Sequence, residues 1–448
     1  MNTKYINNED IISNDEDEYE DENEDEDEDE DKDEDEYTDS NDEDLISNSS
    51  DDNIDQIENL DLNYKIINNY NVIYEIGRGA CSIVWLVYNI NNQHFYALKV
   101  QNPTEYNEGL DEIKFVKKLP ENPNVFNNII DSFIEFINNK KYLCSVWNLH
   151  CTNIDTLIRK NELILSINNV KHIMNQLILA IKILHQNFKV FHGDIKTDNI
   201  LIKGINDKDA FAISEYIKEN FNEKYINEKK IFWTDKGNSL NSINNINKND
   251  KLRIRQNIHK KIVENIMEKI INNNNFSKYS INSKYLEKID ISLADFGTHC
   301  SENNYYDEPF GTRYYQAPEI ILMGKCSYPV DIWALGCTFY ELLTGELIFI
   351  PDQDSKHSRD YYHLCLINDI CGDFSPNFLK KTKYYNNFFD SKYKIKDRDI
   401  KNNKLKINID TLDDYNKKII LNILTQMLEI DPIKRINILS LSKQPFFT

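Results

Sequence analysis

The chain lacks the features that mark membrane, secreted and zinc-binding proteins. No apolar run approaches the length of a membrane span, and no N-terminal apolar segment follows a basic start. The eight cysteines form no C-x-x-C pair, so we expect free thiols in a reducing compartment, with neither zinc nor disulfides. These absences predict an intracellular protein, cytoplasmic, nuclear or both, without a membrane partner.

Glycine is also scarce, with 12 residues in 448, whereas Asn, Ile, Lys and Tyr are abundant. This bias is typical of an AT-rich coding genome, that of a cellular host or a giant virus, and it says little about function. The length suits two or three domain-sized units, or one two-lobed enzyme with additions.

The negative charge of the chain is confined to its beginning. Residues 1–60 contain 29 Asp/Glu and 2 Lys/Arg, a net charge of -27, whereas the whole chain carries -23 and the remainder therefore +4. A segment with so few apolar side chains cannot bury enough surface to offset its ordering entropy, so we predict a disordered acidic tail over residues 1–62. Such a tail is usually a solvated, solubilising one. Alternatively, it mimics an acidic partner, binds basic proteins or folds onto a basic groove to inhibit.

Strand and helix patterns divide the rest of the chain in two. Apolar alternation and short β-branched runs predict one helix over 107–119 and strands over 70–76, 83–87, 95–100, 129–137 and 141–149. From about residue 155 the pattern is helical, most clearly over 170–184, 331–345 and 416–430, whereas 351–410 is less regular. This order predicts a small β-rich unit followed by a larger, mainly helical one.

One stretch concentrates the polar groups that phosphoryl transfer requires. Between two apolar flanks, Asp194, Lys196 and Asn199 place a carboxylate, an ammonium and a carboxamide at offsets of zero, two and five. The carboxylate can accept a hydroxyl proton, the cation can stabilise the moving phosphoryl group, and the carboxamide oxygen can bind Mg²⁺.

These residues, together with Asp295-Phe296-Gly297, resemble the catalytic loop and the metal-binding loop of the eukaryotic protein kinases. The resemblance implies an α+β, two-lobed protein-kinase fold, with the small lobe over 64–150 and the large lobe over 151–448. It also implies that Asp194 is the catalytic base, that Lys196 neutralises charge on the γ-phosphoryl of ATP, and that Asn199 and Asp295 bind Mg²⁺.

A glycine-containing loop lies between the first two predicted strands. Its residues are Ile76, Gly77, Arg78, Gly79, Ala80, Cys81, Ser82, Ile83 and Val84. Two glycines let the backbone approach phosphate oxygens, which accept hydrogen bonds from main-chain N–H groups, and Ser82 replaces the usual third glycine. Alone this pattern is weak, because G-x-G also occurs in ordinary hairpins.

The position of Lys99 makes the glycine loop a stronger indication of a nucleotide site. It lies in an apolar run downstream of the glycines and resembles the kinase lysine that holds the α- and β-phosphates. Its partner should be an acid on the following helix, and we favour Glu112 over Glu108, one turn away.

The last strand of the small lobe resembles the one that leads into the kinase hinge. Trp147 would then be a bulky residue behind the adenine pocket. Backbone groups near Asn148 and His150 would contact adenine, which any side chain allows.

Motifs farther along the chain indicate a kinase of proteins rather than of small molecules. Residues 311–319 resemble the substrate-facing end of the activation segment. Asp331 resembles the helix residue that usually binds the catalytic-loop backbone, and Arg435 resembles the residue that pairs with Glu319.

A basic spacer separates the two halves of the proposed site. Asn199 and Asp295 are 96 positions apart, where most protein kinases have only a few intervening residues. Residues 204–288 contain 16 Lys/Arg and 11 Asp/Glu, and an isoleucine recurs every four residues over 254–270, which predicts an amphipathic helix. We expect this helix to pack on the large lobe; docking for a partner or an anchor is the alternative.

Three traits resemble the serine/arginine-protein kinases: the long spacer, the residue before Asp194, and residues 354–360 leading to His363. Phe296 departs from this group, which tends to have Leu there. The resemblance implies Arg/Ser-rich protein substrates. The residue before the catalytic Asp is usually an Arg that pairs with an activation-loop phosphate, so Gly193 predicts an enzyme that is active without that phosphorylation.

Other functions fit parts of the sequence. A pseudokinase scaffold would assemble partners through its lobes and tails, but it would not need the complete catalytic set. A pure interaction protein would bind basic proteins such as histones through the acidic tail, which leaves the catalytic order unexplained. Tyrosine specificity is weaker, because Lys196 follows the Ser/Thr pattern. We expect a monomer with protein substrates and no direct nucleic-acid contact.

Overall fold

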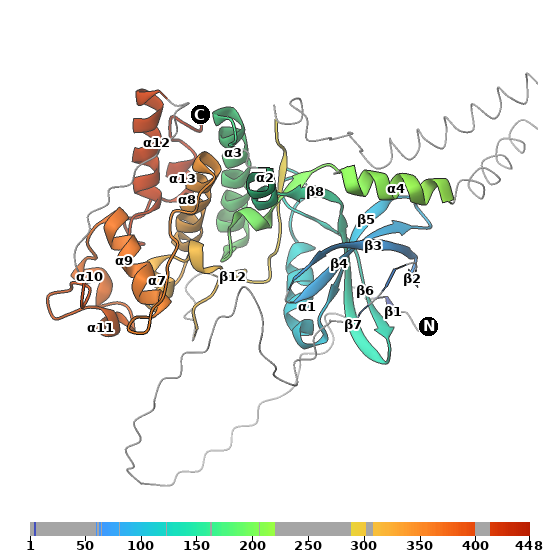
Figure 1. Ribbon diagram of the computed structural model, residues 1–448, viewed down its shortest axis with the longest axis horizontal. Helices are drawn as coiled ribbons and strands as arrows, with labels where there is room; N and C mark the ends of the chain where they lie inside the picture. The colour runs from blue at the N-terminus through green and yellow to red at the C-terminus, as the bar shows by residue number, and fades with distance from the viewer. Residues whose placement is uncertain are drawn as a thin grey trace, which may run out of the picture.

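The computed structural model describes residues 4–5, 60, 62–63, 65–79, 81–121, 123–161, 164–205, 207–219, 288–301, 308–398 and 413–448. These residues form a β-rich lobe and a helical lobe that lie side by side, joined through β8 and α2 (Figure 1). The two-lobed α+β fold predicted from the sequence is confirmed.

The small lobe is a seven-stranded sheet with the strand order β1-β6-β7-β5-β4-β3-β2. All neighbouring strands pair antiparallel. The strands are β1 (Lys4–Tyr5), β2 (Ile66–Ile67), β3 (Tyr70–Arg78), β4 (Ser82–Asn89), β5 (Phe95–Gln101), β6 (Ile129–Ile137) and β7 (Lys140–Asn148).

The centre of this sheet is apolar on both faces. β5 is buried at every position except Lys99, because it lies between β4 and β7 and is covered by further elements. Helix α1 (Tyr106–Val116), which follows the short η1 (Pro103–Glu105), turns Glu112, Ile113 and Phe115 inward. The buried Glu112 and the partly buried Lys99 thus belong to neighbouring elements in a largely apolar lobe.

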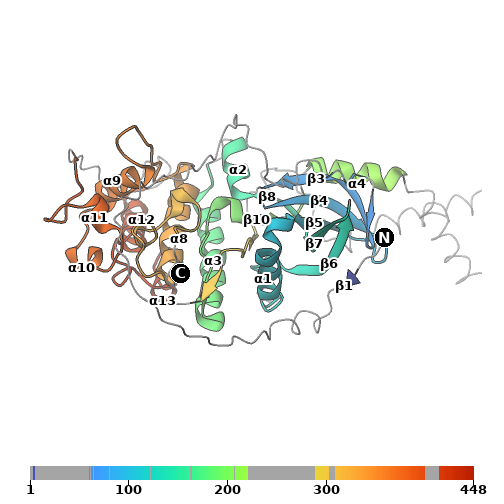
Figure 2. The ribbon, with the colours of Figure 1, turned by 90° about the horizontal axis from the view of Figure 1, so that it is seen from below.

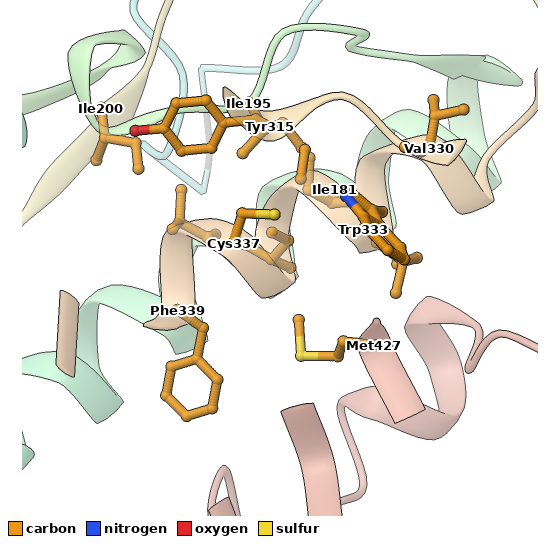
Figure 3. Close-up of a cluster of buried hydrophobic side chains, with 14 of the residues drawn as sticks. Ile181, Ile195, Ile200, Tyr315, Val330, Trp333, Cys337, Phe339 and Met427 are labelled. Carbon is orange, nitrogen blue, oxygen red and sulfur yellow. The ribbon is translucent and has the colours of Figure 1, made fainter. Parts of the chain in front are cut away.

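The large lobe is built around α3 (Ile167–Ile183), α8 (Pro329–Thr344) and α12 (Asp414–Met427). Thirteen of the 16 residues of α8 are buried, and the helix ends at Gly345, whose left-handed φ of 77° suits a C-terminal cap. Figure 3 shows its core, where Trp333, Cys337 and Phe339 of α8 lie near Ile181 of α3 and Met427 of α12. This apolar core of α3, α8 and α12 supports the polar loops that contain the predicted catalytic residues.

Shorter elements complete the large lobe. The helices and helical turns are α2 (Ile154–Asn161), η2 (Leu184–Phe188), η3 (Thr197–Asn199), η5 (Arg313–Tyr315), α7 (Pro318–Ile321), α9 (Arg359–Cys371), α10 (Pro376–Leu379), α11 (Tyr385–Phe388) and α13 (Ile438–Leu441). The strands are β8 (His150–Asn153), β9 (Val190–Phe191), β10 (Ile200–Lys203), β11 (Ile291–Leu293) and β12 (Cys300–Ser301). β10 pairs with both β8 and β11, and β9 pairs with β12.

The prediction that residues 351–410 are less regular was wrong for one part. Residues 359–371 form the helix α9, which begins at Ser358, whose side chain accepts a hydrogen bond from the Tyr361 N–H. The apolar pattern of α9 is interrupted by polar residues such as His363, which is buried. Tertiary packing therefore stabilises a helix that periodicity alone did not reveal.

The first part of the spacer crosses to the small lobe. Helix α4 (Asp207–Glu219) lies along β3 and β4 in both views (Figures 1 and 2). Ile213 is buried against Ile73, Leu86 and Phe95, and the Tyr216 hydroxyl accepts a 2.7 Å hydrogen bond from Asn71 Nδ2. The predicted helix over 254–270 lies outside the described residues.

Parts of the N-terminal residues 1–62 belong to the small lobe. Most of the acidic tail lies outside the described residues, but Lys4–Tyr5 pairs with β6, and Leu60 and Leu62 are buried in the small lobe. None of the eight cysteines, all of which lie in the described residues, forms a disulfide bond. Within the described ranges, none of the helices has the length and apolar character needed to cross a bilayer.

Candidate active site

The catalytic loop runs from β9 to η3 and is fixed from below by Asp331 of α8. The Asp331 carboxylate accepts hydrogen bonds from the backbone N–H groups of His192 (2.9 Å) and Gly193 (3.0 Å). Its Oδ2 atom also lies 2.8 Å from His185 Nε2. Asp331 is almost completely buried, and the three hydrogen bonds compensate the desolvation of its carboxylate. They also fix the position of the catalytic loop relative to α8. The sequence predicted this contact.

Asp194 lies where this loop turns toward solvent, and both of its carboxylate oxygens are bound. Oδ1 accepts a 2.8 Å hydrogen bond from the Thr312 N–H. Oδ2 lies 3.0 Å from Lys196 Nζ and 3.2 Å from Asn199 Nδ2. The three residues predicted at offsets of zero, two and five are therefore in direct contact.

The surroundings of Asp194 keep it ionised. Burial alone would raise the pKa of its carboxyl group, but the Lys196 ammonium and the hydrogen bonds from Thr312 outweigh burial, so the pKa lies below its usual range. The side chain is 11% exposed, which leaves access for a substrate hydroxyl. An ionised carboxylate at this position can accept a proton.

Lys99 and Glu112 form the second part of the site. Lys99 Nζ lies 2.7 Å from Glu112 Oε2, and the other oxygen, Oε1, accepts a 3.1 Å hydrogen bond from the Phe296 N–H. Glu112, favoured over Glu108 from the sequence, thus ties β5 and α1 to the start of the metal-binding loop. Burial would lower the pKa of Lys99, but Glu112 and Asp295 together raise it, so the ammonium stays charged.

Asp295 has a left-handed backbone, with φ of 63°, which is uncommon for a residue other than glycine. Such strain is usual at functional sites, where the surrounding structure imposes it. Its carboxylate contributes, after Glu112, to the raised pKa of Lys99. Glu112, which contacts both Lys99 and the Phe296 N–H, links the predicted nucleotide-binding lysine to the residue that follows the predicted metal ligand.

The donors present fit Mg²⁺ bound together with nucleotide phosphates. Because Asn199 Nδ2 donates to the backbone oxygen and the carboxylate of Asp194, its carboxamide oxygen is left for a cation. Among the described residues there is no cluster of three or more His, Cys, Asp or Glu that could hold a metal alone. One carboxylate and one amide oxygen, completed by phosphate oxygens and water, is a donor set that Mg²⁺ accepts.

The glycine loop is the turn between β3 and β4. The Gly79 N–H donates a 2.9 Å hydrogen bond to the Ser82 backbone oxygen, which closes the turn, and Arg78 forms a surface ion pair with Glu75. Cys81 is exposed at the tip, and Ala80 lies outside the described residues. Burial and Glu105 raise the pKa of the Cys81 thiol, although the Lys99 charge acts in the opposite direction.

The sequence of both lobes matches a known protein family. The family description "Protein kinase domain" matches residues 70–218 and 281–447, which cover both lobes and leave out most of the spacer. The chain belongs to the protein kinase family. The residues between the two matched parts, 219–280, lie within the predicted spacer of residues 204–288.

Curated relatives of this kinase are named as protein kinases. A serine/threonine-protein kinase of Acanthamoeba polyphaga mimivirus is 28% identical, over 84% of this chain and 86% of that protein. The serine/threonine-protein kinase SRPK of Physarum polycephalum is 27% identical and covers 73% of each chain. The dual specificity protein kinase lkh1 of Schizosaccharomyces pombe is 24% identical, over 86% of this chain and 48% of that protein. The likeness to the serine/arginine-protein kinase group stated from the sequence is thus shown.

The hinge of the kinase lies between β7 and β8. Trp147 is buried, and its indole N–H donates a 2.8 Å hydrogen bond to Ser145 Oγ. His150 Nδ1 donates to the backbone oxygen of Asn148 at 3.0 Å, and burial lowers the pKa of the His150 imidazole to about 4. The ring is therefore neutral at physiological pH.

The activation segment is joined to the large-lobe core by two buried acids. Arg435 of the C-terminal region forms a bidentate ion pair with Glu319, at 2.6 and 2.9 Å, as predicted from the sequence. Glu341 of α8 accepts hydrogen bonds from Tyr315 (2.6 Å), Thr197 (3.3 Å) and Arg159 (2.6 Å). The catalytic loop, the activation segment and α2 thus meet at one carboxylate.

The sequence analysis missed Thr312 and Glu341. Thr312 lies in the motif of residues 311–319, but its two contacts, with Asp194 and Lys196, depend on how the activation segment folds back. Glu341 is an isolated acid in an apolar helix, and its burial was the only available signal.

Proposed function

We propose that this protein is an Mg-ATP-dependent kinase that transfers the γ-phosphoryl group of ATP to Ser and Thr hydroxyls of proteins. One observation carries the proposal. The ionised Asp194 contacts Lys196 and Asn199, while Glu112 joins Lys99 to the Phe296 N–H beside Asp295. This set provides a base, two cations and two metal ligands, which is what phosphoryl transfer uses.

Each residue has a part that follows from its contacts. Asp194 accepts the proton of the substrate hydroxyl, because its side chain is 11% exposed and its lowered pKa keeps it ionised. Lys196 lies 3.0 Å from that carboxylate and stabilises the charge on the moving phosphoryl group. Lys99, held by Glu112, binds the α- and β-phosphates.

Asn199 and Asp295 would hold Mg²⁺, which when bound neutralises phosphate charge and orients the γ-phosphoryl group. The backbone of the glycine loop would cover the phosphates. The backbone of Asn148 and the residues beside it would contact adenine.

Transfer to Ser and Thr is supported by Lys196, whose ammonium donates to Thr312 Oγ1 at 2.5 Å and closes the substrate side of the loop. The serine/threonine kinases among the relatives support it further. Phosphoamino-acid analysis of a phosphorylated peptide mixture tests this choice: the proposal expects phosphoserine and phosphothreonine, and phosphotyrosine as the main product would overturn it.

The likeness to the SRPK-named relative supports Arg/Ser-rich proteins as substrates, with the acidic tail available to basic partners. We place the enzyme inside the cell, in cytoplasm or nucleus. An arrayed peptide screen with Arg-Ser repeats tests the substrate class, and equal rates for repeats and scrambled peptides would remove it. Deleting residues 1–60 tests the tail, whose role falls if activity and partners stay unchanged.

Phosphorylation of the activation segment should not be needed for activity. Gly193 has a φ of 83°, and a Cβ atom there would lie 2.8 Å from the Thr298 backbone oxygen, so no Arg fits where a phosphate-binding one usually stands. Enzyme made in bacteria and fully dephosphorylated should still turn over. No activity until another kinase has acted would contradict this.

A further inference from the structure

On one side the catalytic carboxylate is held by Thr312, whose backbone N–H donates to it. Asp194 Oδ1 accepts from the Thr312 N–H at 2.8 Å, whereas Lys196 and Asn199 both contact Oδ2. A carboxylate bound on both oxygens cannot rotate about its last torsion. The position of the Thr312 N–H therefore fixes the direction in which Asp194 presents Oδ2.

The turn just before Thr312 lies tightly against the catalytic loop. Gly311 has a φ of 74°, and a Cβ atom there would lie 2.6 Å from the Gly193 backbone oxygen. Phe310, next to it, places its ring 6.1 Å from the Phe191 ring. Because the turn packs this closely, its position depends on the contacts that hold Phe310 and Gly311 against the catalytic loop.

Gln316 holds the turn from the opposite side. Its side-chain Nε2 donates to the backbone oxygens of Phe310 (3.1 Å) and Gly311 (3.3 Å). The residue is only 5% exposed and lines the same small cavity as Asp194 and Thr312. Two carbonyl groups on successive residues are thus fixed by one amide.

The other end of the Gln316 side chain is not used in this way. Its Oε1 atom is buried and has no hydrogen-bond partner among the residues that the structure describes. Burying an unpaired acceptor is unfavourable, so an apolar side chain would suit a position that only needed to be filled. The donor end accounts for an amide here.

We propose that Gln316 is a positioning residue for phosphoryl transfer, which holds the turn at residues 310–311 so that the Thr312 N–H orients the Asp194 carboxylate. This inference rests on the proposed function for its kinetic consequence. The contact itself is a property of the fold and can be measured without turnover.

The decisive variant is Gln316→Met, which keeps the length of the side chain and removes both donors. Gln176→Met is the matched control: its amide also donates to two backbone oxygens, those of His172 and Ile289, but it lies away from Asp194. Gln316→Lys is the rescue, because an ammonium can donate to both carbonyls and has no acceptor.

Hydrogen exchange of the peptide that contains Thr312 is the first readout. Gln316→Met should speed exchange of the Thr312 amide, and Gln176→Met should leave it at the wild-type rate. In steady-state kinetics, Gln316→Met should lower kcat about 10- to 100-fold, the cost of a misplaced catalytic group, with KM for ATP unchanged. Gln316→Lys should restore both the exchange rate and most of kcat.

Several results would overturn the inference. Wild-type exchange at Thr312 in Gln316→Met would do so, and so would an equal loss of kcat in Gln176→Met. If Gln316→Met is too unstable to assay, Gln316→Lys decides: a loss of kcat with intact nucleotide binding rejects the role. A wild-type enzyme without any transfer would refute the proposed function, while exchange at Thr312 would still decide the contact.

Discussion

Lys99 and Glu112 form a 2.7 Å ion pair between β5 and α1, with the glutamate side chain only 5% exposed. The second oxygen of Glu112 accepts from the Phe296 N–H, so one carboxylate sets both the lysine and the start of the metal-binding loop. A pair of this kind costs more to break than to replace, because breaking it leaves a buried charge without a partner.

Glu112→Gln should therefore reduce kcat/KM for ATP by about 10- to 100-fold, since it weakens a charge-assisted contact and leaves Lys99 without its anion. Glu108→Gln is the matched control on the same helix, because Glu108 is exposed and makes none of these contacts. Steady-state kinetics with varied ATP measures both. Equal losses in the two variants would show that Glu112 has no special part.

Glu341 should make stability depend on pH. Burial raises the pKa of its carboxyl to about 6, against the hydrogen bonds from Tyr315 and the charge of Arg159. Because the pKa of Glu341 is higher in the folded than in the unfolded state, protonation of this carboxyl stabilises the fold. The contribution is fully present below about pH 4.5 and is lost as the pH rises through 6, which lowers the free energy of unfolding by about 2 kcal/mol.

Glu341→Gln should remove this dependence. The difference in unfolding free energy between wild type and variant should change by about 2 kcal/mol between pH 4.5 and 6.5, in the direction of a less stable wild type at higher pH. Chemical denaturation at several pH values measures it. A difference that stays constant over this range would contradict the assignment.

His363 should act in the opposite sense. It is completely buried in α9, both ring nitrogens are without a partner among the described residues, and burial, helped by Arg313, lowers its pKa to about 3. The buried ring stays neutral, whereas the imidazole of the unfolded chain takes up a proton near pH 6.5. The free energy of unfolding therefore falls by about 1.4 kcal/mol for each pH unit below about 6.5.

His363→Leu should consequently stabilise the kinase by about 1–3 kcal/mol at neutral pH, because it removes buried unpaired polar atoms. The gain should be larger at pH 5.5 than at pH 7.5. Thermal unfolding at the two pH values tests this, and a variant less stable than wild type at both would show that the imidazole has a partner.

The start of the spacer should contribute to the stability of the small lobe. Ile213→Ala, which removes a buried side chain between α4 and the sheet, should cost about 2–5 kcal/mol. Phe211 of the same helix is 67% exposed, so Phe211→Ala should change stability by less than about 0.5 kcal/mol. Denaturation of both variants tests the packing of α4, and equal effects would argue against it.

Much of this architecture could be predicted from the sequence because its signals are local. The strands around Lys99 and the helix that carries Glu112 follow from short apolar patterns, and the spacing of Asp194, Lys196 and Asn199 fixes their contacts within one loop. Glu319 and Arg435 could be paired only through resemblance, since 116 positions separate them.

Other features could not be predicted, because they depend on the folded chain. α9 carries a buried histidine, α4 packs on the lobe opposite to the one in which its sequence is inserted, and Thr312 reaches Asp194 only when the activation segment turns back. No periodicity or spacing encodes these contacts. They arise from packing between segments far apart in the chain.

Transfer of labelled γ-phosphoryl from ATP to a serine peptide, by wild type and Asp194→Ala side by side, tests the central claim most directly. Nucleotide binding is measured on the same samples, with Asp373→Ala as the control, since Asp373 is exposed and contacts Lys394 and Asn368. We expect Asp194→Ala to bind nucleotide nearly as wild type does and to transfer nothing, while Asp373→Ala remains active. Transfer by Asp194→Ala at the wild-type rate would contradict the account.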